Sequence, residues 1–199
     1  YILYFFFFTI FTFFIYITIP LFFKYDSLKE NLEKKLYTNF NLDTEITGKI
    51  GYNLLPFPHL EIDKIIINNL PNEQRPLGTI ETIYLKTPLK KLTKLKKINF
   101  KNIEIVKPTI NINLSNISQY NAFLKNLTTR FIKVSSGEIN FFEGSQFISS
   151  FENVNINYLL GSQNKKIVVD GLFLGEKLNI EFQNKKKESQ PLQTVTAKI

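Results

Sequence analysis

Residues 108–114 read Pro-Thr-Ile-Asn-Ile-Asn-Leu, and this stretch decides the fold class because apolar and polar side chains alternate in it. A period of two places Ile110, Ile112 and Leu114 on one side of a β-strand and the two asparagines on the other. Similar alternation recurs along the chain at roughly 10–15-residue intervals, with turn-forming residues between the runs. The chain is therefore predicted to be mainly β, an elongated, twisted and mostly antiparallel sheet with short helices.

The apolar residues of these runs are predicted to form one apolar face of the sheet, because each strand presents its alternate side chains to one side. A single bulge reverses that phase, so the sequence leaves open how the sides join across strands. The face is either an open groove that contacts acyl chains or the closed core of a sandwich, and the periodicity fits both. The candidate lipid-contacting residues are Ile98, Phe100, Ile110, Ile112, Ile139, Phe141, Ile156, Ile180 and Phe182.

Residues 1–23 carry no charge, and nine of them are phenylalanine. A helix of this length spans roughly 34 Å, which exceeds the roughly 30 Å of bilayer hydrocarbon. A cleaved signal peptide has a shorter apolar region and a small-residue cleavage site, and no such site precedes Lys24. We expect residues 1–23 to be a retained transmembrane anchor.

Residues 24–40 are predicted to form a juxtamembrane amphipathic helix. Leu28, Leu32 and Leu36 recur every four residues and give the helix one apolar stripe. This helix either continues the anchor or folds over the first strands. Residues 41–199 then form the β domain, and the strand-like residues 194–199 would leave an open edge, so we expect the β domain to continue in a longer chain.

The sequence offers little for catalysis. It has no cysteine and one histidine, His59, which stands at a strand entrance and is interpreted as structural. Metal-ligand spacings, phosphate-binding glycine loops and nucleophile elbows are missing, so we expect no enzyme, no cofactor, no metal and no small-molecule substrate. The net charge of +8 comes almost entirely from lysine, which is a poor residue for bidentate base recognition, and nucleic-acid binding is not expected.

Residues 43–69, DTEITGKIGYNLLPFPHLEIDKIIINN, resemble the N-terminal region of the AsmA family. The resemblance is carried by a strand with Gly48, a turn made by Pro56-Phe57-Pro58, and a strand that begins with Leu60 and Ile62. A further strand, a Pro88-Leu89-led short helix and a Pro-x-Ile strand at 108–112 follow in the family's order. The resemblance covers roughly residues 1–114. The chain departs from the family in being shorter and in lacking a clear G-x-x-N after Leu114.

The resemblance implies a bacterial inner-membrane protein with a single membrane helix and a periplasmic body. It also implies a U-shaped β-groove that takes part in outer-membrane biogenesis, with phospholipid as its partner and other envelope proteins as further candidate partners. Moving a 16-carbon acyl chain through water costs on the order of 12 kcal/mol, and an apolar trough removes most of that cost. The alternative is a membrane-anchored interaction module with a closed β-core that assists outer-membrane protein assembly or the targeting of proteins to the membrane.

Overall fold

The computed structural model describes residues 1–18, 25–40, 43–68, 75–87, 102–117, 131–160, 164–186 and 191–198. The helices are α1 (Ile2–Thr18), α2 (Asp26–Phe40) and the short 3-10 helix η3 (Leu114–Asn116). The strands are β1 (Thr44–Ile46), β2 (Ile50–Asn53), β3 (His59–Ile67), β4 (Gly78–Lys86), β5 (Asn102–Asn113), β6 (Phe131–Glu143), β7 (Gln146–Leu160), β8 (Asn164–Phe173), β9 (Glu176–Lys186) and β10 (Pro191–Lys198).

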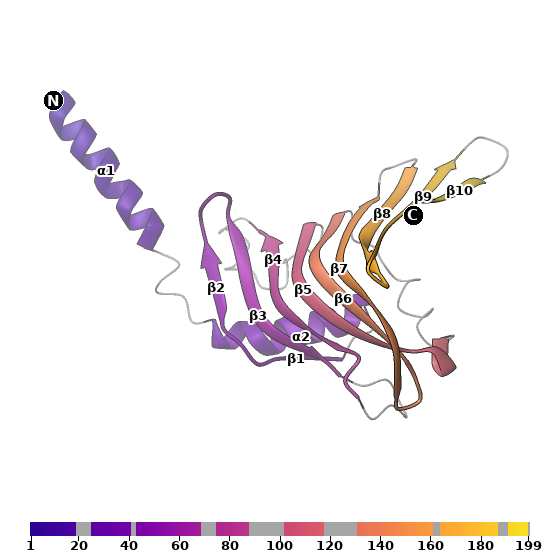
Figure 1. Ribbon diagram of the computed structural model, residues 1–199. Helices are drawn as coiled ribbons and strands as arrows, with labels where there is room; N and C mark the ends of the chain where they lie inside the picture. Colours follow the sequence, from indigo (N-terminus) through magenta and orange to yellow (C-terminus); the bar gives the residue numbers. More distant parts are fainter. Residues whose placement is uncertain are drawn as a thin grey trace.

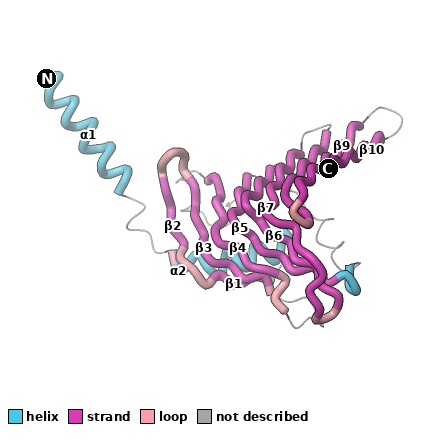
Figure 2. The backbone as a smooth tube through the Cα atoms, in the orientation of Figure 1, coloured by secondary structure: helices cyan, strands magenta, loops and turns pink. Residues whose placement is uncertain are grey.

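All the described strands belong to one open sheet, in the order β1-β3-β4-β5-β6-β7-β8-β9-β10, and β2 pairs with β3 beside β1. Figure 1 shows the sheet curving along its strands, and Figure 2 shows how fully strands dominate the chain. The mainly β class is confirmed. Every pairing is antiparallel except β5 with β6, which run parallel. The Pro56-Phe57-Pro58 turn lies where it was predicted, between β2 and β3.

Helix α2 packs on one face of the sheet through its leucine stripe. Leu28, Leu32 and Leu36 are 0%, 1% and 7% exposed and belong to the same apolar cluster as the buried residues of β1–β5. The Glu33 carboxylate also accepts a hydrogen bond from the Ile46 backbone N–H at 2.8 Å. Of the two arrangements left open by the sequence, the helix therefore adopts the one in which it covers the first strands (Figure 1).

Helix α1 contains 17 residues, all of them within the predicted anchor of residues 1–23, and residues 19–23 lie outside the described residues. Of the helices within the described ranges, none combines the length and the apolarity that crossing a bilayer requires. Side chains along α1 are exposed, and Thr9 and Thr12 donate their hydroxyls to the carbonyls of Phe5 and Phe8 at 2.8 Å.

Several predictions fall outside the described residues. These are the short helix that begins at Pro88 and the candidate residues Ile98 and Phe100. Strand β5 begins after the undescribed residues 88–101 and continues without interruption from Asn102 to Asn113.

The alternation changes phase once, by one residue, in each strand from β3 to β7. At that point, two successive residues of the apolar face are separated by three positions in the sequence instead of the usual two. The pairs are Ile62 and Ile65, Ile80 and Ile83, Ile105 and Pro108, Val134 and Gly137, and Phe151 and Val154.

In four of these strands a non-glycine residue within the change of phase has a positive φ, a conformation that costs about 1–2 kcal/mol. These residues are Lys64, Lys107, Ser136 and Asn153, with φ of 48°, 46°, 54° and 49°. The change of phase is in register across β3–β6, and register shifts in the β6–β7 and β7–β8 pairs accommodate the change in β7. The apolar residues before and after it therefore stay on one face of the sheet.

Candidate functional site: the apolar face of the sheet

The candidate site is the face on which two rows of apolar and aromatic residues run across seven strands. The strand registers join each residue to its neighbour, from β3 to β9. The first row is Leu60, Leu85, Ile103, Ile132, Tyr158, Ile167 and Phe182. The second row is Ile62, Ile83, Ile105, Val134, Ile156, Val169 and Ile180. With neighbouring strands about 4.8 Å apart, each row extends for roughly 29 Å.

These rows are closed at one end and open at the other. In the first row Leu60, Leu85 and Ile103 are 0%, 1% and 5% exposed, because α2 covers this end. Phe182, in the same row on β9, is 40% exposed. The second row follows the same trend, since Ile62 is 1% exposed whereas Ile156 and Ile180 are half-buried. The face is thus an ordinary core over β3–β5 and an accessible apolar surface toward β9, and between them Tyr158 on β7 is also buried, at 5% exposed.

Seven of the nine candidate residues lie on this face. Ile156 and Ile180 stand in the second row, where both pair with Val169, and Phe182 ends the first row. Beyond the change of phase, Ile110 pairs with Ile139 and Ile112 with Phe141 across the parallel β5–β6 pair. Ile110 also packs against the core cluster. The remaining two candidates, Ile98 and Phe100, lie outside the described residues, and acyl-chain contact by any of the nine stays a prediction.

Sequence reasoning missed most of the two rows, since only Ile156, Ile180 and Phe182 of their fourteen residues were among the candidates. Ile83, Ile105, Val134 and Val169 belong to the second row but were not among the candidates. Their signal was present in the sequence as apolar spacings of two interrupted by one spacing of three. This pattern can be recognised only when the sequences of several strands are aligned at the spacing of three.

A family model of the AsmA family matches residues 2–129 of the chain. This chain belongs to the AsmA family. The match includes the order of elements from α1 to β5, with α2 and the closed end of the apolar face. No curated protein and no solved structure matched the chain significantly. Membership of the AsmA family indicates a function related to the cell envelope. The open end of the face, on β8 and β9, lies beyond the matched residues.

The opposite face of the AsmA sheet is polar. Ion pairs join neighbouring strands there: Lys133 Nζ lies 2.8 Å from Glu104 Oε1, and Lys166 Nζ lies 3.0 Å from Glu181 Oε1. The hydrogen bond from Lys166 lowers the pKa of the Glu181 carboxyl. Because these side chains are partly exposed, water screens both ion pairs and each contributes little to stability.

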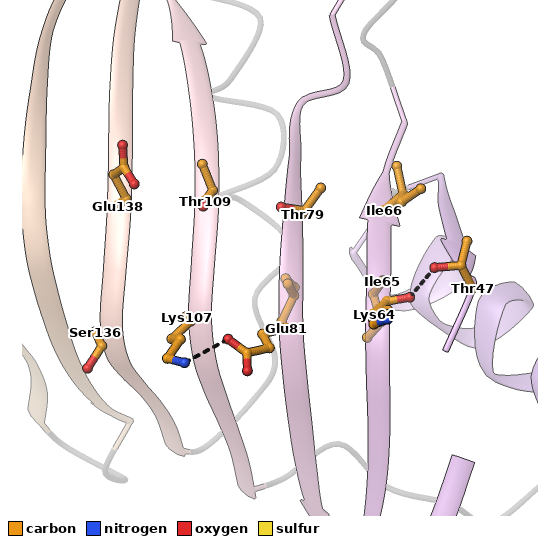
Figure 3. A pocket seen from close by; sticks show the side chains of 11 residues that line it. Thr47, Lys64, Ile65, Ile66, Thr79, Glu81, Lys107, Thr109, Ser136 and Glu138 are labelled. Carbon is orange, nitrogen blue, oxygen red and sulfur yellow. Dashed lines mark hydrogen bonds and ion pairs between the residues drawn. The ribbon is translucent and has the colours of Figure 1, made fainter. Parts of the chain in front are cut away.

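A shallow hollow of about 550 Å³ lies on this polar face where the strands change phase (Figure 3). Lys64, Glu81, Lys107 and Ser136 line up across β3–β6, and Lys107 Nζ lies 3.0 Å from Glu81 Oε2. Lysines, carboxylates and hydroxyls are mixed in the lining, so its charges neutralise one another. Within the described part of the chain, no cluster of three or more His, Asp or Glu side chains could hold a metal ion.

Tyr52 and His59 have structural partners. The buried Tyr52 hydroxyl donates to the Thr87 backbone carbonyl at 2.8 Å. Burial raises the pKa of Tyr52 to about 12, with smaller contributions from the phenols of Tyr16 and Tyr25. His59 Nδ1 lies 2.7 Å from the Phe57 carbonyl oxygen, and its ring meets Tyr84 edge-on at 5.4 Å. These contacts fix the base of the β2–β3 hairpin.

Proposed function

We propose that this AsmA protein conducts phospholipid along its apolar face, without catalysing a reaction, in the biogenesis of the bacterial outer membrane. The observation that carries the proposal is the pair of apolar rows that cross seven strands and become accessible toward β9. Such a face receives acyl chains by removing apolar surface from water, which needs no catalytic group.

The size of the face supports this function. A 16-carbon chain gains on the order of 12 kcal/mol when it leaves water, at about 0.8 kcal/mol per CH₂. A path that keeps the chain against apolar side chains at every strand retains much of this gain. Lipid headgroups stay hydrated because the sheet is open rather than closed into a barrel. The accessible path includes β8 and β9, since α2 occupies the face over the first strands.

We further propose that the N-terminal apolar segment anchors the protein in the inner membrane, with the β domain in the periplasm. The uncharged residues 1–23 and the envelope association of the AsmA family support this topology. Reporter domains fused after Lys187 should be active outside the cytoplasm. Activity of a cytoplasmic reporter at that position would contradict the topology.

Photo-crosslinking tests the lipid path. A photoreactive residue at Phe182, on the exposed end of the first row, should capture phospholipid in intact membranes. The matched control is Asn179, which is exposed on the same strand but on the opposite face. Leu60 is a second control, because it lies in the same row but is 0% exposed under α2. Equal capture at Phe182 and Asn179, or capture at neither, would refute conduction along this face.

A second candidate function is a membrane-anchored interaction module with a closed β-core. The covering of β3–β5 by α2 favours it, because this part of the face is already a sealed core. In that case a protein partner, rather than lipid, would cover β8 and β9. Crosslinks from Phe182 to a protein in place of lipid would support this candidate.

A further inference from the structure

The β2–β3 hairpin ends in an exposed apolar tip. Leu55 and Phe57 are 79% and 56% exposed, and the two prolines beside them are also exposed. Pro56 and Pro58 fix the backbone φ angles on both sides of Phe57, so the tip loses little conformational entropy when it binds. The His59 contact to the Phe57 carbonyl oxygen holds the same segment. The hairpin thus presents two large apolar side chains on a stiff support.

Charged residues follow the tip in a fixed order. The first row below it pairs His59 with Lys86, whose Nζ lies 4.8 Å from the centre of the Phe57 ring. Acidic side chains come only in a later row, in which Tyr84 pairs with both Glu61 and Glu104. From the tip inward, the residues are thus apolar, then cationic, then acidic. This order matches the order of environments from the membrane interface through the phosphate layer into water.

The tip also lies toward α1. Figure 1 shows the β2–β3 hairpin pointing to the side of the sheet on which α1 lies. Burial is the main cause of the raised pKa of Tyr52 in β2, and the phenol of Tyr16, in the last turn of α1, adds to it. A membrane that holds the N-terminal segment would meet this edge of the sheet first.

We propose that the β2–β3 tip is a second membrane contact, in which Leu55 and Phe57 enter the interface of a bilayer containing anionic phospholipid and Lys86 meets lipid phosphates. This inference rests on the membrane association proposed above but not on lipid conduction. The tip and the anchor together hold the sheet in one orientation, with the edge that carries the starts of β3, β5 and β6 against the bilayer.

Tryptophan fluorescence tests the contact because the chain contains no tryptophan. Phe57→Trp reports on the tip, and Phe147→Trp is the matched control. Phe147 is 53% exposed near the β6–β7 turn at the opposite edge of the sheet. A cation lies close there as well, since Arg75 stacks on the neighbouring Phe142 ring at 4.3 Å. The two sites therefore share their chemistry and differ in their position relative to α1.

The full chain is reconstituted in vesicles of phosphatidylethanolamine and phosphatidylglycerol, and protein that floats with the vesicles is measured. Phe57→Trp should show blue-shifted emission and strong quenching by lipids brominated on their acyl chains, whereas Phe147→Trp should show neither. Leu55→Asp in the Phe57→Trp chain should remove most of the quenching while circular dichroism stays unchanged. Lys86→Gln should weaken quenching only when phosphatidylglycerol is present.

Equal quenching at the two tryptophans would overturn the inference. Lipid capture at Phe182 in a protein whose tip is not quenched would refute the tip contact and leave conduction intact. Quenching at the tip without lipid capture at Phe182 would support the tip contact and refute lipid conduction.

Discussion

Leu32→Ala tests whether α2 closes one end of the apolar face. Leu32 is 1% exposed at the centre of the stripe that packs on the sheet. The substitution removes three buried carbons, which costs about 2.4 kcal/mol at about 0.8 kcal/mol each. A residual cavity of ~50 Å³ adds about 1.2 kcal/mol at ~24 cal/mol per Å³. We therefore expect the free energy of unfolding to fall by about 3–4 kcal/mol.

The assay is urea unfolding of the full chain in detergent micelles, followed by circular dichroism. Alanine is at least as good a helix former as leucine, so the loss measures packing against the sheet rather than helix formation. Tyr37→Ala is the matched control, because Tyr37 is 56% exposed on the same helix, and its substitution should change stability by about 0.5 kcal/mol or less. A loss at Leu32 below about 1 kcal/mol, or equal to the loss at Tyr37, would refute the closed end.

Four further substitutions probe other parts of the molecule. Ile62→Asp places an unpaired charge in the sealed core and should leave little folded protein in expression trials, whereas Ile112→Asp, at a half-buried position, should fold but lose lipid capture in crosslinking assays. Tyr52 keeps its proton more tightly when folded, so stability should be complete below about pH 10 and fall as the pH rises toward 12; Tyr52→Phe should abolish this fall in pH-dependent unfolding. Gly78→Ala should destabilise the sheet by several kcal/mol in thermal unfolding, because the new Cβ would clash with the Thr109 carbonyl oxygen; an unchanged melting temperature would contradict the tight β4–β5 pairing.

Single strands were predictable because their signal is local. In β9, Leu178, Ile180 and Phe182 alternate with polar residues, and the observed strand, Glu176–Lys186, contains the whole run. The leucine stripe of α2 was equally plain, since a spacing of four needs no knowledge of other elements. The surface against which the stripe packs depends on the tertiary structure, so neither that surface nor the closed end of the apolar face could be predicted from the stripe.

The change of phase was not predictable from any single strand. Its left-handed residues are lysine, serine and asparagine rather than glycine, so no residue type announces the conformation. Lys64 adopts it where the Thr47 hydroxyl and the Thr47 and Gly48 backbone N–H groups all donate to its carbonyl. Those donors come from a segment 16 or 17 residues away, so the local sequence around Lys64 cannot predict these hydrogen bonds.

The parallel pairing of β5 with β6 has a consequence for how this sheet forms. Antiparallel pairs such as β6–β7 and β8–β9 are joined by two-residue turns, and hairpins of this kind close in about 1–10 μs. At the parallel pair, contacts such as Val106 with Ser135 join residues on either side of a long connection, and the entropy of closing that loop is lost before any contact repays it. We expect β1–β5 and β6–β10 to assemble as two meanders and to meet in the slowest step. During synthesis the first meander, with α2 already on its face, would then serve as the template on which the second one aligns.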